Sequence, residues 1–167
     1  MSTSPAASAL EPRLRERYPE LVAARGELTV VVEREDLMDE LAWLKDSMGL
    51  GFLASLTATD WPDRSPRFWL AYELRSLDPP ARLRVKVGLP VGDPHVPSVT
   101  GPYPTADWHE RETFDLYGIE FDGHPSLTRI LLPDGWEGYP LRKTEPLGGV
   151  NTRFHGAFHP PIDQRIS

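Results

Sequence analysis

Cysteine is absent from this 167-residue sequence. That excludes disulfides, thiolate-held iron–sulfur clusters, thiol catalysis and cysteine-based zinc sites. Long apolar runs are also missing, because the most apolar stretch, residues 49–58, is far shorter than the ~20 residues needed to cross a bilayer. Basic residues are in the minority, with 18 Lys and Arg against 25 Asp and Glu and a net charge of −7. This balance argues against general binding to nucleic acid or to anionic membranes.

Signatures of catalysis are scarce as well. The sequence has no glycine-rich phosphate loop, no G-x-G-x-x-G after a strand and no G-x-S-x-G elbow, so the usual marks of nucleotide binding and acyl transfer are missing. Residues 1–10 contain neither the basic segment nor the apolar segment of a secretory signal. We therefore expect a soluble, cytoplasmic protein that meets a membrane only through a partner.

What is present is typical of one globular domain, with 40% hydrophobic and 26% charged residues. Residues 11–25 carry apolar positions at helical spacing and predict a helix, and residues 28–32 predict a buried strand. A second helix is predicted from Leu37, Leu41, Leu44 and Met48, which share one face, and residues 52–58 predict another strand.

The clearest pattern is a pair of strands with period-two alternation, residues 67–75 and 82–89, joined by a proline-containing turn. A last helix is predicted from an N-cap at Thr105 to Tyr117, with Gly118 as its left-handed cap. The order α-β-α-β-β-β-α predicts an α+β fold in which helices pack on one face of a small, mostly antiparallel sheet.

Three segments follow from this pattern. Residues 1–10 are a frayed N-terminus and residues 11–132 form the α+β domain. Residues 133–167 contain five prolines and five glycines without periodicity. We interpret this last segment as an extended tail that docks on a partner, because it cannot build a core of its own.

Two groups of polar residues near the last helix are candidate sites. His109, Glu112 and His124 are the candidate ligands of a metal-dependent enzyme, although the spacing meets few metal-site criteria, and the histidines are expected in loops or at exposed positions. The run from His109 to Asp115 is more simply a charged helix surface on which Arg111 and Asp115 pair at i, i+4. Paired carboxylates for acid–base catalysis are the alternative.

A basic strand face is the other candidate. Arg82, Arg84 and Lys86 point to one side, beside Arg67 and Arg75 and interrupted by Glu73. We interpret this face as solvated, or as a local docking face for an acidic partner, in preference to a nucleic-acid site.

The segment from Glu110 to Leu132, ERETFDLYGIEFDGHPSLTRILL, and the later GYPLRK from Gly138 to Lys143 resemble the signature of a known family. It is the 30-kDa subunit family of respiratory complex I, the bacterial NADH–quinone oxidoreductase. The upstream order of elements resembles that family's N-terminal domain too. Thr144 and Glu145 depart from the family pattern, in which an acidic residue, an aromatic residue and proline follow the Arg-Lys pair.

The resemblance implies a cofactor-free, non-catalytic subunit of the hydrophilic arm on the cytoplasmic side of the bacterial inner membrane. Its implied partners are the large hydrogenase-like subunit that helps to form the quinone site and the neighbouring iron–sulfur subunits. The equivalent subunit of a membrane-bound hydrogenase, or of a ferredoxin- or deazaflavin-dependent dehydrogenase, is the alternative within the family.

The resemblance also maps the family signature onto particular residues, which we take as determinants of fold and interface. Arg129, Arg142 and Lys143 would suit charge pairing across a subunit boundary. The full set is Glu110, Arg111, Glu112, Asp115, Tyr117, Gly118, Phe121, Gly123, His124, Pro125, Leu127, Arg129, Ile130, Leu131, Pro140, Leu141, Arg142 and Lys143.

Overall fold

The computed structural model describes residues 5–133 and 135–145. The first four residues of the expected frayed end and residues 146–167 of the expected tail lie outside the described part. In chain order the elements are α1 (Pro5–Arg17), β1 (Val22–Ala24), β2 (Glu27–Val31), the 3₁₀ helix η1 (Arg34–Asp36), α2 (Leu37–Asp46), β3 (Phe52–Asp60), β4 (Phe68–Leu77), β5 (Pro80–Leu89), β6 (His95–Pro97), α3 (Ala106–Tyr117) and β7 (Glu120–Asp122).

The main sheet has five strands in the order β1-β2-β5-β4-β3. All neighbours are antiparallel except β2 and β5, which run parallel. The predicted hairpin is β4 and β5, paired from Phe68 opposite Leu89 to Leu77 opposite Pro80. A separate pair, β6 and β7, is parallel. The predicted α+β class with a mostly antiparallel sheet is confirmed.

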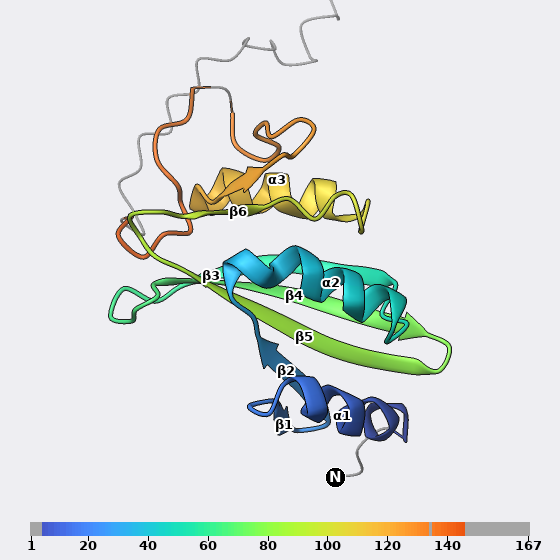
Figure 1. The fold of residues 1–167 in the computed structure, drawn as a ribbon. Coiled ribbons are helices and arrows are strands. Elements are labelled where there is room, and N and C mark those ends of the chain that lie inside the picture. Colours follow the sequence, from blue (N-terminus) through green and yellow to red (C-terminus); the bar gives the residue numbers. More distant parts are fainter. Residues whose placement is uncertain (1–4, 134, 146–167) are drawn as a thin grey trace, which may run out of the picture.

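The core lies on one face of this sheet. Alternate residues of β4 and β5, such as Leu70, Tyr72 and Val85, are fully buried, while the residues between them are partly exposed. Leu14 of α1 and Leu41 of α2 belong to the same buried cluster. In Figure 1, α2 lies across the long strands, α1 lies beside β1 and β2, and α3 lies near β6. The α2 face predicted from leucine spacing is the buried one.

The N-terminal helix differs from the prediction. It starts at Pro5 and ends at Arg17, whereas residues 11–25 were expected to be helical. The reason is a tight turn: Arg25 and Gly26 both have positive φ angles, 53° and 80°, which is the backbone of a two-residue hairpin turn. Residues Val22–Ala24 therefore pair with β2 as an exposed edge strand.

The three short strands β1, β6 and β7 were not predicted, because three residues show no usable periodicity. Of the helices in the described part of the chain, none combines the length and the apolar character required to span a membrane.

Candidate functional site

The signature begins on α3, whose N-terminal residue Thr105 was expected to cap the helix. Its hydroxyl instead donates to the carbonyl oxygen of Leu53 on β3, at 3.0 Å, and makes no capping bond. The C-terminal end is as predicted: Gly118 adopts the left-handed conformation with φ 66°. Glu110 and Asp115 are both fully buried on this helix, so it is not the solvated charged surface that the sequence suggested.

Asp115 joins α3 to the chain that follows it, residues 124–133 and 135–145, which we call the strap. Its carboxylate accepts hydrogen bonds from the backbone N–H groups of residues 130, 131 and 132, at 3.0, 2.8 and 2.9 Å. It also pairs with Arg129 at 2.7 Å. Burial opposes ionisation, but these donors outweigh it and hold the pKa of Asp115 below its usual value. The expected pair of Asp115 with Arg111 is therefore wrong.

Arg142 holds the far end of the strap against α3. Its guanidinium donates to the carbonyl oxygens of Tyr117 and Gly118, at 2.6 and 3.3 Å. It lies between the rings of Phe68 and Tyr139, 5.2 and 4.6 Å from their centroids. A Cβ on Gly118 would stand 2.5 Å from the Tyr139 ring. Glycine is therefore required here for close approach as well as for its φ angle.

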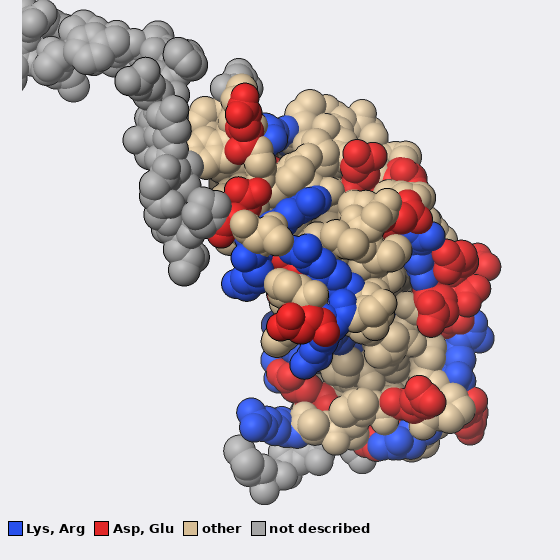
Figure 2. All heavy atoms as spheres, turned by 90° about the vertical axis from the view of Figure 1, so that its left-hand side faces the viewer, with Lys and Arg blue, Asp and Glu red and all other residues tan. Residues whose placement is uncertain are grey.

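A second buried carboxylate, Asp60 at the end of β3, completes this attachment. It accepts two hydrogen bonds from Arg67, at 2.6 and 2.8 Å, and one from the backbone N–H of Lys143, at 2.7 Å. Arg67 is the main reason that the pKa of Asp60 lies below its usual value. Arg67 thus belongs to this cluster and not to the basic strand face. Figure 2 faces this end of the molecule, where Lys and Arg side chains gather in a band.

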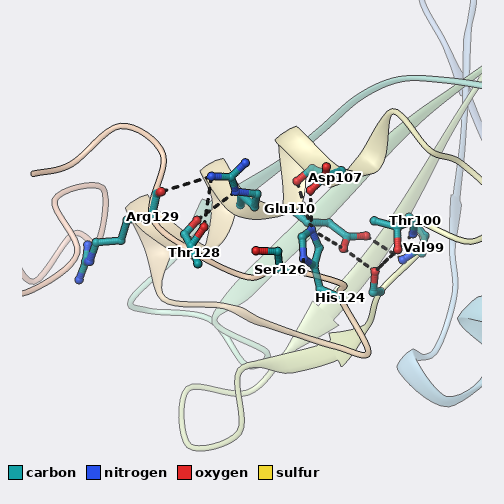
Figure 3. A network of polar contacts seen from close by, with 10 residues as sticks. Val99, Thr100, Asp107, Glu110, His124, Ser126, Thr128 and Arg129 are labelled. Atoms are coloured by element: carbon teal, nitrogen blue, oxygen red, sulfur yellow. Dashed lines mark hydrogen bonds and ion pairs between the residues drawn. The ribbon is translucent and has the colours of Figure 1, made fainter. Parts of the chain in front are cut away.

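Glu110 and His124 form the other buried polar group (Figure 3). Glu110 accepts hydrogen bonds from the Ser98 hydroxyl and the Val99 N–H, both at 2.7 Å. The backbone N–H of Ser126 donates to Nδ1 of His124, at 3.0 Å. Nε2 lies 3.1 Å from the Asp107 carboxylate and 3.9 Å from that of Glu110.

This group fastens the start of the strap to α3. Burial raises the pKa of Glu110, opposed by its bonds to Ser98 and Val99. The His124 side chain is fully enclosed, which corrects the expectation that the histidines are exposed. Between the two ends of the strap, Arg111 donates to the carbonyl oxygens of Thr128 and Arg129, at 3.2 and 3.4 Å, and lies over the Trp108 ring (Figure 3).

The proposed metal ligands do not assemble. His109, Glu112 and His124 form no ligand group, and within residues 5–133 and 135–145 no three His, Cys, Asp or Glu residues are placed to hold a metal ion. His155 and His159 lie outside the described residues. The acid–base pair is not formed either, since Glu110 is buried and Glu112 is exposed.

The remaining signature residues divide between the core and the surface. Phe121 is buried, while Tyr117 and Leu127 are partly buried and pack against the core. Gly123 has φ 80° with no atom near a Cβ, and Ile130 is half-buried. Those exposed at the surface are Glu112, Pro125, Leu131, Pro140, Leu141 and Lys143.

Asp60 and Ser98 were missed by the sequence reasoning. Asp60 did carry a signal: it continues the buried alternation of Leu56 and Ala58 along β3, so its carboxylate must lie on the core face. A carboxylate there needs partners. Ser98 lies in a proline-rich loop without any such pattern.

Comparison with known proteins gives relatives along most of the chain. A profile of the family described as respiratory-chain NADH dehydrogenase, 30 Kd subunit, matches residues 30–151. The matching NADH-quinone oxidoreductase subunit of Nocardioides sp. (strain ATCC BAA-499 / JS614) is 46% identical, over 97% of this chain and 66% of that protein. Its counterpart in Mycolicibacterium gilvum (strain PYR-GCK) is 48% identical, over 90% and 68%. The one in Saccharopolyspora erythraea is 49% identical, over 84% and 58%. The chain thus spans about two thirds or less of the length of these relatives.

Two solved structures share the fold. The trypsin-resistant fragment (1-134) of Nqo5 is 38% identical, with a TM-score of 0.63 over 72% of this chain and 97% of the fragment. A chain in the structure of the membrane-bound sulfane sulfur reductase, an archaeal respiratory membrane complex, is 26% identical. Its TM-score is 0.72, over 84% of this chain and 85% of that one.

Proposed function

Because the chain belongs to the 30-kDa subunit family of respiratory-chain NADH dehydrogenase, we propose that it is a structural subunit of a proton-translocating NADH:quinone oxidoreductase. It supports electron transfer from NADH to quinone without carrying out the chemistry. In this proposal it sits in the hydrophilic arm on the cytoplasmic side of the bacterial inner membrane. It holds the large hydrogenase-like subunit of the quinone site, next to the iron–sulfur subunits.

One observation carries this proposal: the charged signature residues are used to build a surface. Asp115, Glu110, Arg111 and Arg142 all bind groups of the chain itself. They fix the strap along α3, where each of them is held by several bonds. A catalytic group must instead be open to a substrate.

The strap then presents apolar side chains to solvent beside α3. Trp108, Leu131 and Leu141 are 61%, 60% and 43% exposed. Trp108 touches Arg111, Leu131 follows the backbone held by Asp115, and the Leu141 N–H donates to the Leu116 carbonyl oxygen, at 3.1 Å. Apolar and aromatic groups next to arginines are the composition of protein interfaces. We call these three residues the strap surface and propose that it meets the large subunit.

The charged residues contribute to this surface unequally. Arg129 and Arg142 were expected to pair across the subunit boundary, but both have partners within the chain. Lys143 is exposed, and its backbone rather than its side chain is bonded to Asp60. In the proposal, Lys143 therefore supplies the cross-boundary charge. The expected docking role of residues 133–167 stays a proposal, although residues 141–143 contact their own domain.

The test is co-isolation of the tagged full chain from solubilised membranes. The wild type should bring down the hydrogenase-like subunit together with FMN and NADH-oxidising activity. The double variant Leu131→Glu, Leu141→Glu should lose at least nine tenths of that subunit, because charges replace interface apolar groups. Leu77→Glu, at a site 77% exposed on β4, is the matched control. Equal recovery from the double variant and the control would overturn the assignment of this surface.

The same experiment separates the alternative within the family. The shared fold with a chain of an archaeal sulfane sulfur reductase complex shows that the family architecture also occurs in a complex with a different name. Co-isolation with nickel and a hydrogenase large subunit, without NADH oxidation, would favour a hydrogenase-type complex.

A further inference from the structure

The second face of the main sheet is not covered by any element of the described chain. Along β4, β5 and β3 the residues that alternate with the buried ones are exposed or partly exposed. The helices contribute to the single buried cluster on the other face. We call the uncovered side the open face; it consists of Glu27, Thr29, Val31, Phe52, Ser55, Thr57, Thr59, Trp69, Ala71, Glu73, Arg75, Arg82, Arg84, Lys86 and Gly88.

The open face is partly apolar and has a row of mostly small side chains across its middle. This row consists of Val31, Lys86, Ala71 and Thr57, and Val31 is 57% exposed. Small side chains in this row let another backbone approach closely.

Gly88 keeps the neighbouring row low. A Cβ at Gly88 would stand 2.3 Å from Pro66 and 3.4 Å from Trp69. The glycine therefore lets Pro66 and the Trp69 ring lie against the sheet, where Lys86 covers the ring at 5.0 Å.

The open face is also the basic part of an acidic chain. It carries three arginines and Lys86 against Glu27 and Glu73, in a protein of net charge −7. Arg84 is bonded to both of these glutamates. Arg75 and Arg82 stand directly opposite each other on β4 and β5, both exposed, and neither has an ion-pair partner among the residues described. Like charges directly opposite each other destabilise a sheet on its own.

From this juxtaposition we propose that the open face docks an acidic helical segment of a partner protein. A carboxylate placed between Arg75 and Arg82 would relieve their repulsion, while the apolar side of the helix covers Val31, Ala71 and Trp69. This surface is distinct from the strap surface, and the inference does not depend on which complex the chain serves.

Size and charge select this occupant over others. Four strands about 4.8 Å apart and eight residues long give an area of about 14 by 26 Å. A helix about 10 Å wide and 18 residues long, roughly 27 Å, fits it. A second copy of the chain would oppose arginines with arginines. The chain's own residues 146–167 carry Arg153 and Arg165 against only Asp163. Glu27 and Glu73 would repel the phosphates of nucleic acid or lipid.

The experiment places a photo-crosslinking p-benzoylphenylalanine at Thr57, in the middle of the open face, of the tagged full chain in its native membranes. Mass spectrometry then maps the attached peptide. The expected result is one segment of another protein with a net negative charge. Attachment to a neutral or basic segment, to a second copy, to lipid or to nucleic acid would overturn the proposal, and so would no attachment at all.

Charge reversal gives the second readout. The double variant Arg75→Glu, Arg82→Glu should lower the yield of that adduct at least threefold, while Arg25→Glu, in the exposed β1–β2 turn, should leave it unchanged. If thermal unfolding shows that the double variant is destabilised, Arg82→Gln alone should still lower the yield. An unchanged yield in folded variants would overturn the role of the charges. Recovery of the hydrogenase-like subunit in the same samples reports on the proposed function separately.

Discussion

Asp115→Asn is the sharpest test of how the strap is held. The substitution keeps the size of the side chain but removes its charge. Asn has one acceptor oxygen and one NH₂ group, whereas Asp115 accepts four hydrogen bonds, three from backbone N–H groups and one from Arg129. The NH₂ group must face donors, so buried donors lose their partners.

The expected loss follows from burial. Removing one partner of a buried ion pair costs about 3–5 kcal/mol. Arg129 is 25% exposed and regains some water, which places the effect near the lower limit, about 3 kcal/mol. This corresponds to a fall in Tm of roughly 10 °C for a domain of this size. Urea unfolding followed by circular dichroism measures it, with Glu112→Gln on the exposed side of α3 as a control within about 0.5 kcal/mol of the wild type.

The pH dependence provides an independent check. Asp115 has a lowered pKa in the folded state. Its contribution is therefore complete above the unfolded pKa, about 3.9, and is lost as the pH falls through the folded value. The difference between wild type and Asp115→Asn should be largest near pH 7 and shrink below about pH 4. A difference under about 1 kcal/mol at pH 7, or one that does not change with pH, would refute this account of the strap.

The remaining predictions concern the neighbouring contacts. Burial raises the pKa of Glu110 above 4.5, so folding takes up a proton and the stability of the wild type relative to Glu110→Gln should fall as the pH rises from about 4.5 to 8; unfolding titrations at both limits measure this, and a parallel pH profile would contradict it. Gly118→Ala should cost about 2–4 kcal/mol, from the left-handed φ and the clash with Tyr139. Gly123→Ala has φ 80° with open space around it and should cost only about 1 kcal/mol; equal losses in the two variants would mean that the Tyr139 contact is unimportant.

The sequence predicted the parts of the fold that obey local periodicity. The alternation in β4 and β5 and the leucine face of α2 reflect one buried side per element, and that side is visible in a short window of sequence. The edge strand β1 escaped because all three of its residues are exposed. Its only signal was the Arg25-Gly26 turn.

The candidate site was predictable in its members but not in its contacts. Local rules paired Asp115 with Arg111 because the two are four residues apart on a helix. The structure chooses Arg129, from a segment beyond β7, because that segment must be fixed to the helix and because its backbone N–H groups need an acceptor. Such long-range pairing has no signature in spacing. His124 shows the same limit, since it was assigned to an exposed loop and is enclosed by α3 and the strap.

The signature residues therefore divide by depth. Buried members fix the strap, and exposed members such as Leu131 and Leu141 are left for a partner. Substitution of a buried member should act on folding and on assembly together, whereas substitution of an exposed member should act on assembly alone.

The most direct test of the central claim is native electrophoresis of solubilised membranes, with the tagged full chain detected in the same lanes as NADH dehydrogenase activity. The account predicts that the chain migrates in the high-mass, NADH-oxidising band, and that the purified chain alone oxidises no NADH. Migration of the chain by itself, away from any such band, or NADH oxidation by the isolated chain would contradict it.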